Sequence, residues 1–302
     1  MKLSYNEFLV LTAIEKIKIS CSQRNLAELT DLSLGTINNV VSNLFKNGLI
    51  DDSNLITDEG LKALEPYMVK RAIFLAAGFG SRMVPITLNT PKPMVIVNGK
   101  RIIEALLDAV VEAGIKEIII VTGYLSEQFE LLLKKYPNIK FVYNEKYNEA
   151  NNISSAYLVR DKFANAYVLE SDLLLYNKNL IRKYEYQSNF LGKYVSVTDD
   201  WCLEVKNGMI VKEKVGGYNC YQMLGISYYD ASDAIKMEKD LEMVYKSPGG
   251  KEKYWEQVFL DICKKNYQIA VRECYEGDIV EIDTFNELKE IDKSYDKVYK
   301  KR

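Results

Sequence analysis

The chain of 302 residues contains no histidine. This absence excludes histidine as a general acid or base, serine–histidine and cysteine–histidine nucleophile pairs, and zinc sites with imidazole ligands. The five cysteines are scattered, and no two of them have a CxxC-type spacing. We therefore expect buried free thiols in a reducing compartment, and neither a disulfide framework nor a four-cysteine zinc site.

Long hydrophobic runs and a strong net charge are also missing. No uninterrupted apolar run approaches the roughly 18 residues that a membrane span requires, and the N-terminus lacks the apolar core and cleavage site of a signal peptide. Lys and Arg number 40 and Asp and Glu 42, a formal charge of −2. This balance excludes a chain-wide basic surface for nucleic acid or membrane. We expect a cytoplasmic protein with no membrane partner.

What remains is an ordinary globular composition, with 48% hydrophobic and 27% charged residues. The length fits two domains, and the sequence pattern changes near residues 65–70. Residues 1–66 favour short helices, whereas residues 70–302 favour alternating strands and helices. We predict a domain boundary between these two segments.

Residues 1–66 resemble a winged helix-turn-helix domain. Ser22 and Ser33 are suited to cap two of its helices, and residues 50–57 would form the wing. The pattern predicts helices over 5–19, 23–29, 34–47 and 58–64 and a hairpin over 49–57. DNA is a partner that this resemblance implies, but residues 1–70 hold seven basic and nine acidic residues, which disfavours strong binding. A regulatory or dimerising role, including a homodimer, stays open.

Residues 70–302 show buried-type strands that alternate with helices. Apolar residues on both faces of the strands indicate a parallel sheet covered on both sides. Between about 194 and 230 we expect shorter strands with glycines, in an antiparallel insertion. The predicted strands cover 71–76, 117–122, 139–143 and 166–170, and a predicted helix covers 102–112.

The sharpest signal is a glycine loop directly after the first of these strands. Small residues allow backbone N–H groups to approach an anion closely, and Arg82 can add a bidentate contact to phosphate. Lys92 lies between two prolines, which stiffen the segment and aim the lysine at a second phosphate. The loop runs through Ala76, Ala77, Gly78, Phe79, Gly80, Ser81 and Arg82.

This loop and Lys92 resemble the signature of the nucleotidyltransferases that join a nucleoside triphosphate to a phosphorylated small molecule. Residues 121–124, 151–155, 170–172 and 280–283 narrow the resemblance to the LicC-like choline-phosphate cytidylyltransferases. The family implies an α/β fold with a doubly wound, mostly parallel, Rossmann-like sheet. It also implies Mg²⁺ as cofactor, CTP and a phosphorylated amine such as phosphocholine as substrates, and CDP-choline and pyrophosphate as products.

Two aspartates follow strands of the second domain, where ligands bind in open α/β sheets. By resemblance, Asp172 and Asp283 are the metal ligands, with Glu170 and Glu281 near them. Arg82, Lys92, Asp172 and Asp283 are the predicted catalytic residues. Because a phosphomonoester is already anionic at pH 7, the reaction needs no general base. The remaining nucleotide contacts implied by the family are Gly123, Asn152, Ser154, Ser155 and Glu170.

The acceptor pocket is predicted within an aromatic stretch that also carries acidic residues. Aromatic faces and negative charge hold a trimethylammonium group, whereas a primary ammonium needs hydrogen-bond acceptors. Phosphoethanolamine and 2-aminoethylphosphonate therefore stay open beside phosphocholine. The predicted pocket residues are Asp200, Trp201, Tyr221, Tyr254, Trp255 and Glu256.

Two other functions use the same features. A sugar-1-phosphate nucleotidyltransferase shares the glycine loop, and a transcriptional regulator could keep the fold as a ligand sensor. Retention of both basic residues and both aspartates favours the enzyme, because a sensor has no need of metal ligands.

Overall fold

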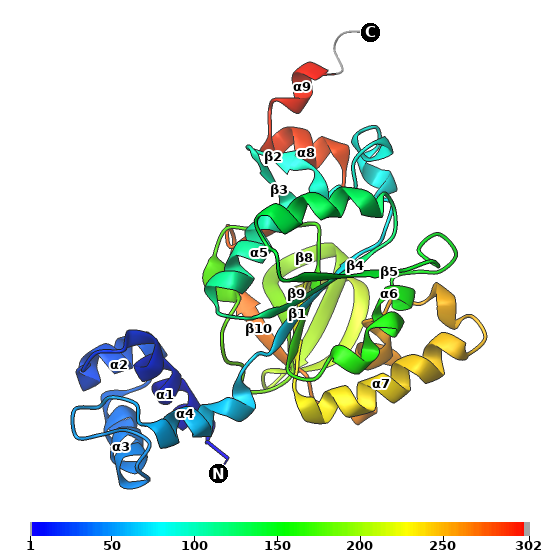
Figure 1. Ribbon diagram of the computed structural model, residues 1–302. Coiled ribbons are helices and arrows are strands. Elements are labelled where there is room, and N and C mark those ends of the chain that lie inside the picture. Colours follow the sequence, from blue (N-terminus) through cyan, green and yellow to red (C-terminus); the bar gives the residue numbers. More distant parts are fainter. Residues whose placement is uncertain (1, 299–302) are drawn as a thin grey trace. The chain divides into compact units, whose positions relative to one another are not determined.

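The computed structural model describes residues 2–298, which form two compact units (Figure 1). The first unit comprises residues 2–68 together with Tyr184–Tyr186. The second comprises residues 69–183 and 187–298. No helix within residues 2–298 is long and apolar enough to cross a membrane. All five cysteines are free and buried.

The first unit is a helical bundle with a small core. Serine side chains cap its first three helices by accepting backbone hydrogen bonds, and Ser22 and Ser33 do so as predicted. The hairpin expected over 49–57 is only a single antiparallel bridge between Ile50 and Ile56, so the wing stays a prediction. The helices are α1 (Tyr5–Ile17), α2 (Gln23–Thr30), α3 (Leu34–Lys46), α4 (Asp58–Leu64) and the 3₁₀ helix η1 (Glu65–Tyr67).

A short segment from later in the chain completes this bundle. The ring of Tyr186 stacks on that of Tyr67, with centroids 5.6 Å apart. The hydroxyl of Tyr186 also donates a hydrogen bond to the backbone oxygen of Leu3, at 3.1 Å. Nothing in the sequence pattern indicated this contribution, because contacts between residues far apart along the chain leave no local periodicity.

The second unit is built on a seven-stranded sheet of order β10-β8-β9-β6-β1-β4-β5. Its centre is parallel, since β1 pairs in parallel with β4 and β6, and β4 with β5. The predicted α/β class with a mostly parallel core is confirmed, and four strands and one helix have the predicted bounds. These are β1 (Arg71–Ala76), β4 (Glu117–Thr122), β5 (Ile139–Tyr143), β6 (Ala166–Glu170) and α5 (Ile102–Glu112).

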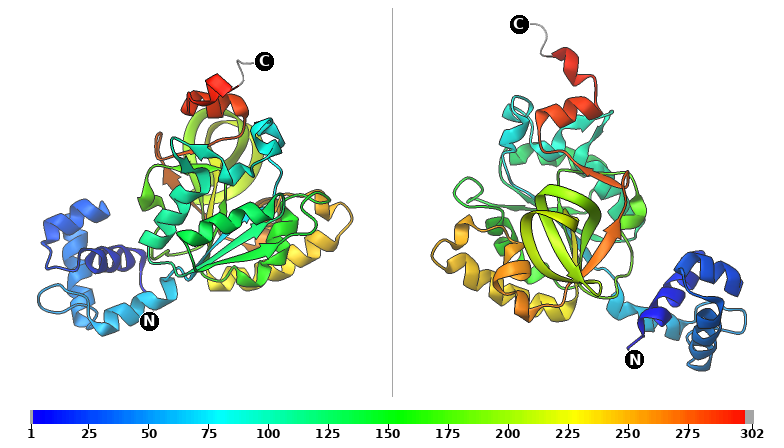
Figure 2. Two further views of the ribbon diagram at one scale, coloured as in Figure 1. Left: turned by 45° about the horizontal axis from the view of Figure 1, so that its top comes forward. Right: turned by 180° about the vertical axis from the view of Figure 1, so that it is seen from behind.

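Both faces of this sheet are covered. Along β1, Phe74 belongs to the hydrophobic core on the side of α5, whereas Ile73 belongs to the core on the side of α7. Figure 2 (left) shows α5 and α7 on opposite sides of the strands. Because successive strand residues point to opposite faces, burial on both sides requires a continuous apolar run. The other covering helices are α6 (Ile153–Leu158) and α7 (Ala231–Lys246).

The antiparallel part differs from the expectation of short strands. It is one long curled hairpin, visible in Figure 2 (right), that pairs β9 antiparallel with β6. The register shifts between Thr198 and Trp201, where Gly216 on the facing strand has φ +70°. These irregularities interrupt the alternation in the sequence without ending the strands. The strands of the hairpin are β8 (Asn189–Lys206) and β9 (Met209–Tyr229). The edge strand β10 (Ala270–Cys274) pairs in parallel with β8.

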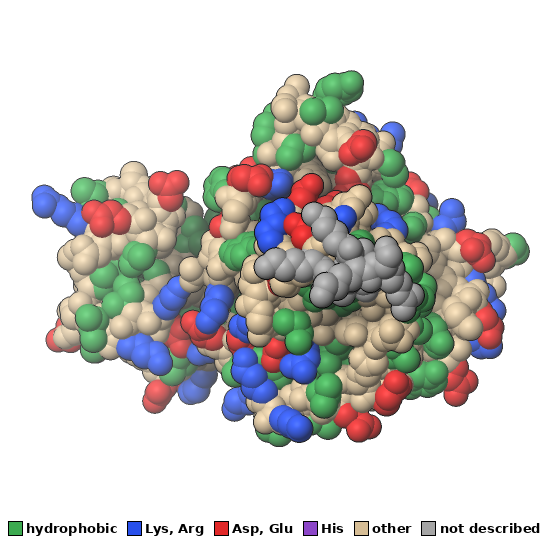
Figure 3. All heavy atoms as spheres, turned by 90° about the horizontal axis from the view of Figure 1, so that it is seen from above, with side chains coloured by type: hydrophobic (Ala, Val, Ile, Leu, Met, Phe, Trp, Pro, Cys, Tyr) green, Lys and Arg blue, Asp and Glu red, His purple; other side chains and the backbone are tan. Residues whose placement is uncertain are grey.

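Shorter elements surround the sheet. The strand pairs are β2 (Ile96–Val97) with β3 (Lys100–Arg101), and β7 (Leu173–Leu175) with β11 (Ile279–Glu281). The last helices are α8 (Phe285–Ile291) and α9 (Tyr295–Val298). On the face in Figure 3, acidic and basic side chains are interspersed. The single-turn and irregular helices are η2 (Ser81–Met83), η3 (Ile86–Leu88), η4 (Lys92–Met94), η5 (Ser126–Lys134), η6 (Arg160–Lys162), η7 (Lys178–Leu180), η8 (Gly250–Glu252), η9 (Val258–Ile262) and η10 (Lys264–Asn266).

Candidate active site

A cavity of about 590 Å³ opens at the carboxyl ends of β1 and β6. The glycine loop after β1 forms one wall. Gly80 has φ +68°, and a Cβ atom there would lie 3.0 Å from Cβ of Lys92. Glycine therefore permits both the turn and the close approach of the loop to the lysine. Every loop residue from Ala76 to Arg82 lines the cavity except Phe79, whose ring packs edge-on against Tyr124.

The predicted catalytic residues meet in this cavity. Nζ of Lys92 lies 2.6 Å from Oδ2 of Asp172 and 3.1 Å from Oδ1 of Asp283. Arg82 reaches the same Oδ1 atom of Asp283, at 2.6 Å from its Nη2. Burial alone would lower the pKa of Lys92, but the two aspartates outweigh it and raise that pKa. The lysine is therefore held as a cation between two carboxylates from different strands.

Three carboxyl groups form a second grouping beside this lysine. Glu170, Asp172 and Glu281 each place one oxygen within 4.8 Å of the others. Oδ1 of Asp172 is buried and has no hydrogen-bond partner within residues 2–298. Burial and neighbouring carboxylates raise the pKa values of Glu170 and Glu281. A divalent cation such as Mg²⁺, which prefers carboxylate oxygens, fits this donor set.

The trio differs from the predicted pair of metal ligands. Asp172 belongs to it, whereas Asp283 accepts hydrogen bonds from Arg82 and Lys92 instead. Glu170 fits only because residue 225, which faces it, is a glycine. A Cβ at Gly225 would lie 2.5 Å from Oε2 of Glu170. The family resemblance implies that the two glutamates lie near the metal ligands, whereas no motif in the sequence points to Gly225.

Polar groups line the opposite wall near the start of α6. The side-chain amide of Asn144 donates to Oγ of Ser154 and Oγ of Ser155, at 2.9 and 3.0 Å. Asn152 lines the cavity and accepts a hydrogen bond from the backbone N–H of Trp255 through its Oδ1 atom. Gly123 does not line the cavity. A Cβ at that position would lie 2.6 Å from Cβ of Tyr147, so its role is close packing.

The predicted acceptor residues divide into two sets. Trp201 and Tyr254 line the cavity, and their rings meet edge to face at 5.7 Å; Asp200 and Glu256 line it as well. Tyr221 and Trp255 are elsewhere. The hydroxyl of Tyr221 donates to the carboxylate of Glu273. Trp255 is only 2% exposed and packs in the core against Phe163 and Phe259.

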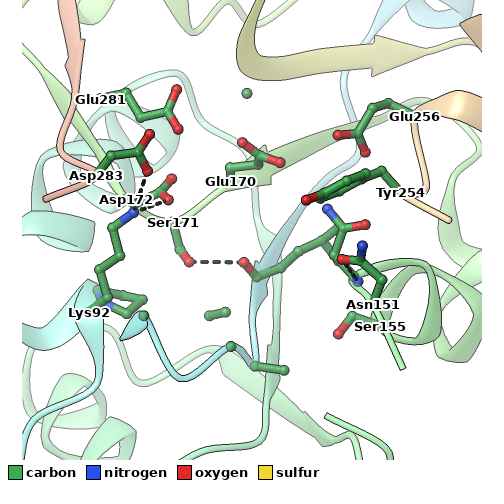
Figure 4. Close-up of a pocket in the computed structure, with 18 of the residues that line it drawn as sticks. Lys92, Asn151, Ser155, Glu170, Ser171, Asp172, Tyr254, Glu256, Glu281 and Asp283 are labelled. Atoms are coloured by element: carbon green, nitrogen blue, oxygen red, sulfur yellow. Dashed lines mark hydrogen bonds and ion pairs between the residues drawn. The ribbon is translucent and has the colours of Figure 1, made fainter. Parts of the chain in front are cut away.

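The separation of Tyr254 from Trp255 has a simple geometric origin. The two residues are consecutive, and their side chains leave the backbone in different directions, one toward the cavity and one toward the core. An aromatic pair in the sequence does not reveal which ring faces a ligand. Figure 4 shows Tyr254 and Glu256 together on one side of the cavity, opposite Lys92 and Asp172.

Several residues that line the cavity were not among those predicted to have a functional role. Ser171 donates from its hydroxyl to the backbone oxygen of Leu75, at 2.9 Å, and so ties the end of β6 to the start of the glycine loop. Its position between Glu170 and Asp172 was the available signal. Other residues of the wall without a motif of their own are Asn144, Tyr147, Phe190, Met223 and Gly225.

Comparisons with known proteins place the second unit among enzymes. Residues 71–201 match the family described as nucleotidyl transferase. The 2-aminoethylphosphonate cytidylyltransferase of Lancefieldella rimae is 35% identical over 228 residues, which cover 74% of this chain and 92% of that protein. The choline-phosphate cytidylyltransferase of Streptococcus pneumoniae is 35% identical over 224 residues, which cover 74% and 96%.

A solved structure agrees with these sequence matches. The CTP:phosphocholine cytidylyltransferase of Streptococcus pneumoniae superimposes with a TM-score of 0.69 at 34% sequence identity. The superposition covers 75% of this chain and 99% of that structure. The two relatives, one named for a phosphonate and one for choline phosphate, have equal identity to this chain. Overall similarity therefore does not decide between the two acceptors.

Proposed function

Because the chain belongs to the nucleotidyl transferase family, we propose that it is a cytidylyltransferase. The reaction transfers CMP from CTP to a phosphorylated or phosphonylated amine and releases pyrophosphate. The observation that carries this proposal is the single cavity in which the glycine loop, Arg82, Lys92, Asp172 and Asp283 converge. The two cytidylyltransferase relatives support cytosine as the base.

The reaction requires that the acceptor oxygen be aligned with the α-phosphorus of CTP, and it requires no proton transfer by the protein. A phosphoryl oxygen of the acceptor is anionic at neutral pH, since the second pKa of a phosphomonoester is about 6. This oxygen attacks the α-phosphorus of CTP; the new O–P bond forms as the bond to the β-phosphate oxygen breaks, and pyrophosphate leaves. No proton has to be removed, which suits a chain without histidine.

The cationic side chains provide the charge stabilisation. Lys92 is nearly buried and fixed by two carboxylates, so its ammonium stays in one place beside the α-phosphate. Arg82 pairs with Asp283 and is two-thirds exposed, so its guanidinium group lies at the open side of the cavity, where it would contact the β- and γ-phosphates together with the amides of the glycine loop. Fixed charges of this kind stabilise a transition state more than a ground state, because they need no reorganisation.

A divalent cation, which we take to be Mg²⁺, completes the proposed site. Asp172 would hold it together with oxygens of Glu170 and Glu281, which lie close to its own. Asp283, which pairs with Arg82 and Lys92 in this structure, is the second aspartate that we propose as a ligand. The ion would neutralise charge on the triphosphate. Asn152, Ser154 and Ser155 on the opposite wall would orient the nucleotide. Trp201, Tyr254 and Glu256 would bind the acceptor.

The test is pyrophosphate release measured over a matrix of substrates. CTP, UTP, ATP and GTP are each combined, with Mg²⁺, with phosphocholine, phosphoethanolamine, 2-aminoethylphosphonate and glucose 1-phosphate. We expect release with CTP and at least one of the three amines. Preference for glucose 1-phosphate would instead identify a sugar-1-phosphate nucleotidyltransferase. Absence of turnover with every pair, together with nanomolar binding to a DNA operator, would favour a regulator with a sensor domain.

A further inference from the structure

The carboxyl group of Glu256 is a buried acceptor in the cavity wall, and one of its oxygens has no hydrogen-bond partner among the described residues. The residue is 6% exposed, and the oxygen in question is Oε2. Burial raises the pKa of this carboxyl group, and this effect is larger than the lowering by the backbone N–H of Glu256 and the side chain of Asn152. One carboxylate oxygen is left without a hydrogen-bond donor among the described residues.

A second carboxylate faces Glu256. Figure 4 shows the carboxyl groups of Glu170 and Glu256 pointing toward each other, with Tyr254 beside Glu256. Within residues 2–298, no lysine or arginine forms an ion pair with either glutamate. The cations of the cavity, Arg82 and Lys92, are engaged by Asp283 and Asp172. Among the described residues, no cationic side chain therefore compensates the charge of Glu256.

A third acidic residue adds to this negative region. Glu213, on β9, is 7% exposed and does not line the cavity, and its Oε2 atom also has no partner in the part of the chain that the structure describes. Burial, followed by the charges of Glu256 and Asp261, raises the pKa of Glu213 to about 8. Burial raises the pKa of Glu256 to about 7. A bound cation would favour the ionised form of both groups.

Two kinds of cationic head group would respond differently to this arrangement. A primary ammonium has three N–H donors and can supply the hydrogen bond that Oε2 of Glu256 lacks. A trimethylammonium group has none and would leave this buried oxygen without a partner. The edge-to-face rings of Trp201 and Tyr254 accept either cation, so they do not discriminate between the two.

We propose that the acceptor carries a primary ammonium group and that Glu256 is the residue that selects it. This inference rests on the proposed cytidylyl transfer and deepens it, because it names the chemical class of the acceptor. The shared feature is a protonated amine a short alkyl chain away from the phosphoryl group. Both 2-aminoethyl phosphate and 2-aminoethylphosphonate have this feature.

The test is a methylation series measured with the full-length protein, CTP and Mg²⁺. The acceptors are 2-aminoethyl phosphate and its N-methyl, N,N-dimethyl and N,N,N-trimethyl derivatives, the last being phosphocholine. We expect kcat/KM to fall stepwise and to be at least tenfold lower for the trimethyl compound, since polar sites reject analogues that leave them unpaired. 2-Aminoethylphosphonate is measured in parallel. Comparison of its kcat/KM with that of 2-aminoethyl phosphate shows whether the enzyme prefers a phosphonate or a phosphate ester.

Substitution of the selecting residue gives the second measurement. In Glu256→Gln, we expect the ratio of kcat/KM between the primary and trimethyl acceptors to shrink to within about threefold, while KM for CTP changes less than KM for the primary amine. Glu252→Gln is the matched control, because Glu252 is exposed on the neighbouring η8 and does not line the cavity. It should keep the wild-type ratio.

Three results would overturn the inference. The first is a wild-type preference for phosphocholine, and the second is a wild-type ratio of kcat/KM between the primary and trimethyl acceptors that is below tenfold. The third is an unchanged ratio in folded Glu256→Gln protein. The wild-type series needs no variant, so it decides the question even if Glu256→Gln fails to fold. Absence of pyrophosphate with every member would mean that the proposed function itself has failed, which is distinct from turnover with the wrong preference.

Discussion

Nζ of Lys92 lies between Oδ2 of Asp172 and Oδ1 of Asp283, at 2.6 and 3.1 Å. The two aspartates come from segments far apart in the sequence, after β6 and after β11. Because both aspartates contact one ammonium group, the lysine, the two carboxylates and the glycine loop lie in one cavity. The proposed reaction depends on this cluster of groups more than on any other feature of the molecule.

The first prediction concerns Asp172. Replacing Asp172 with Asn removes a charge from the proposed metal site but keeps the side-chain shape, so kcat should fall by about 10²–10³-fold, as when a group that stabilises the transition state is removed. The melting temperature should change by only about 5 °C, because Asp283 still pairs with Lys92. Steady-state pyrophosphate release and thermal melting measure the two effects.

Asp161→Asn is the control for this substitution. Asp161 is half exposed, pairs with its neighbour Lys162 and does not line the cavity, so its charge has no role there. Its variant should retain full activity. Metal-dependent turnover in Asp172→Asn near the wild-type rate would show that Asp172 is not a metal ligand.

The second prediction concerns stability without the lysine. Lys92→Met leaves the carboxylates of the cavity with no buried counter-charge, and breaking such a pair costs about 3–5 kcal/mol. We expect the melting temperature to fall by about 10 °C. Because Mg²⁺ would replace the missing positive charge, its addition should raise the melting temperature of the variant more than that of the wild type.

Lys178→Met serves as the comparison, since Lys178 pairs with Glu112 on the surface and such pairs contribute about 1 kcal/mol or less. Its melting temperature should be nearly that of the wild type with and without Mg²⁺. An equal response to Mg²⁺ in Lys92→Met and the wild type would argue against a metal site at these carboxylates.

The third prediction separates the acceptor from the nucleotide. Trp201 lines the cavity on the side of Tyr254 and Glu256, so Trp201→Ala should raise KM for the amine about tenfold and leave KM for CTP within about twofold. Tyr194→Ala is the control, because the Tyr194 ring packs on Tyr221 outside the cavity. Equal increases in both KM values would place the acceptor pocket elsewhere.

The fourth prediction follows from the buried acid Glu213. Its pKa, raised to about 8, lies above the value near 4.5 expected in the unfolded chain. The folded protein therefore binds more protons between these two pH values, and stability falls as pH rises through this window. Glu213→Gln removes the titrating group, so the variant should match the wild type near pH 5 and be on the order of 1–3 kcal/mol more stable near pH 8.5.

Chemical denaturation at the two pH values measures this effect. Lys212→Met is a suitable comparison, because Lys212 neighbours Glu213 on β9 but is exposed. The comparison variant should show the wild-type dependence on pH. A constant stability difference between Glu213→Gln and the wild type at both pH values would mean that Glu213 is ionised throughout the range.

The strands of the parallel core could be predicted from the sequence, whereas those of the curled hairpin could not. β1 and β4 are continuous apolar runs, because both of their faces are buried, and such runs have clear ends. In β8 and β9, register shifts and glycines break the alternation that marks a strand. The same region hides Glu213, which stands between Lys212 and Lys214 in a segment that is typical of a solvent-exposed strand.

Within the cavity, motifs predicted the wall formed by the glycine loop and Lys92 more completely than the proposed acceptor wall, where Tyr221 and Trp255 of the six predicted residues do not line the cavity. The glycine loop and Lys92 have fixed spacing, because backbone geometry dictates it. Trp255 and Tyr254 have no such constraint, and only packing determines that one ring enters the core while the other faces the cavity. The unpaired oxygen of Glu256 also could not be predicted from the sequence, because the absence of a hydrogen-bond partner leaves no pattern in the order of the residues.

The most direct test of the account is to identify the product of one reaction. CTP and 2-aminoethyl phosphate are incubated with the protein, with and without Mg²⁺, and followed by ³¹P NMR and mass spectrometry. The prediction is that, only when Mg²⁺ is present, one pyrophosphate appears for each molecule of a new diphosphate diester, in which the CMP phosphorus is bonded through oxygen to the phosphate of 2-aminoethyl phosphate and the amine stays free. Unchanged CTP under both conditions, with phosphocholine and 2-aminoethylphosphonate equally inert, would contradict it.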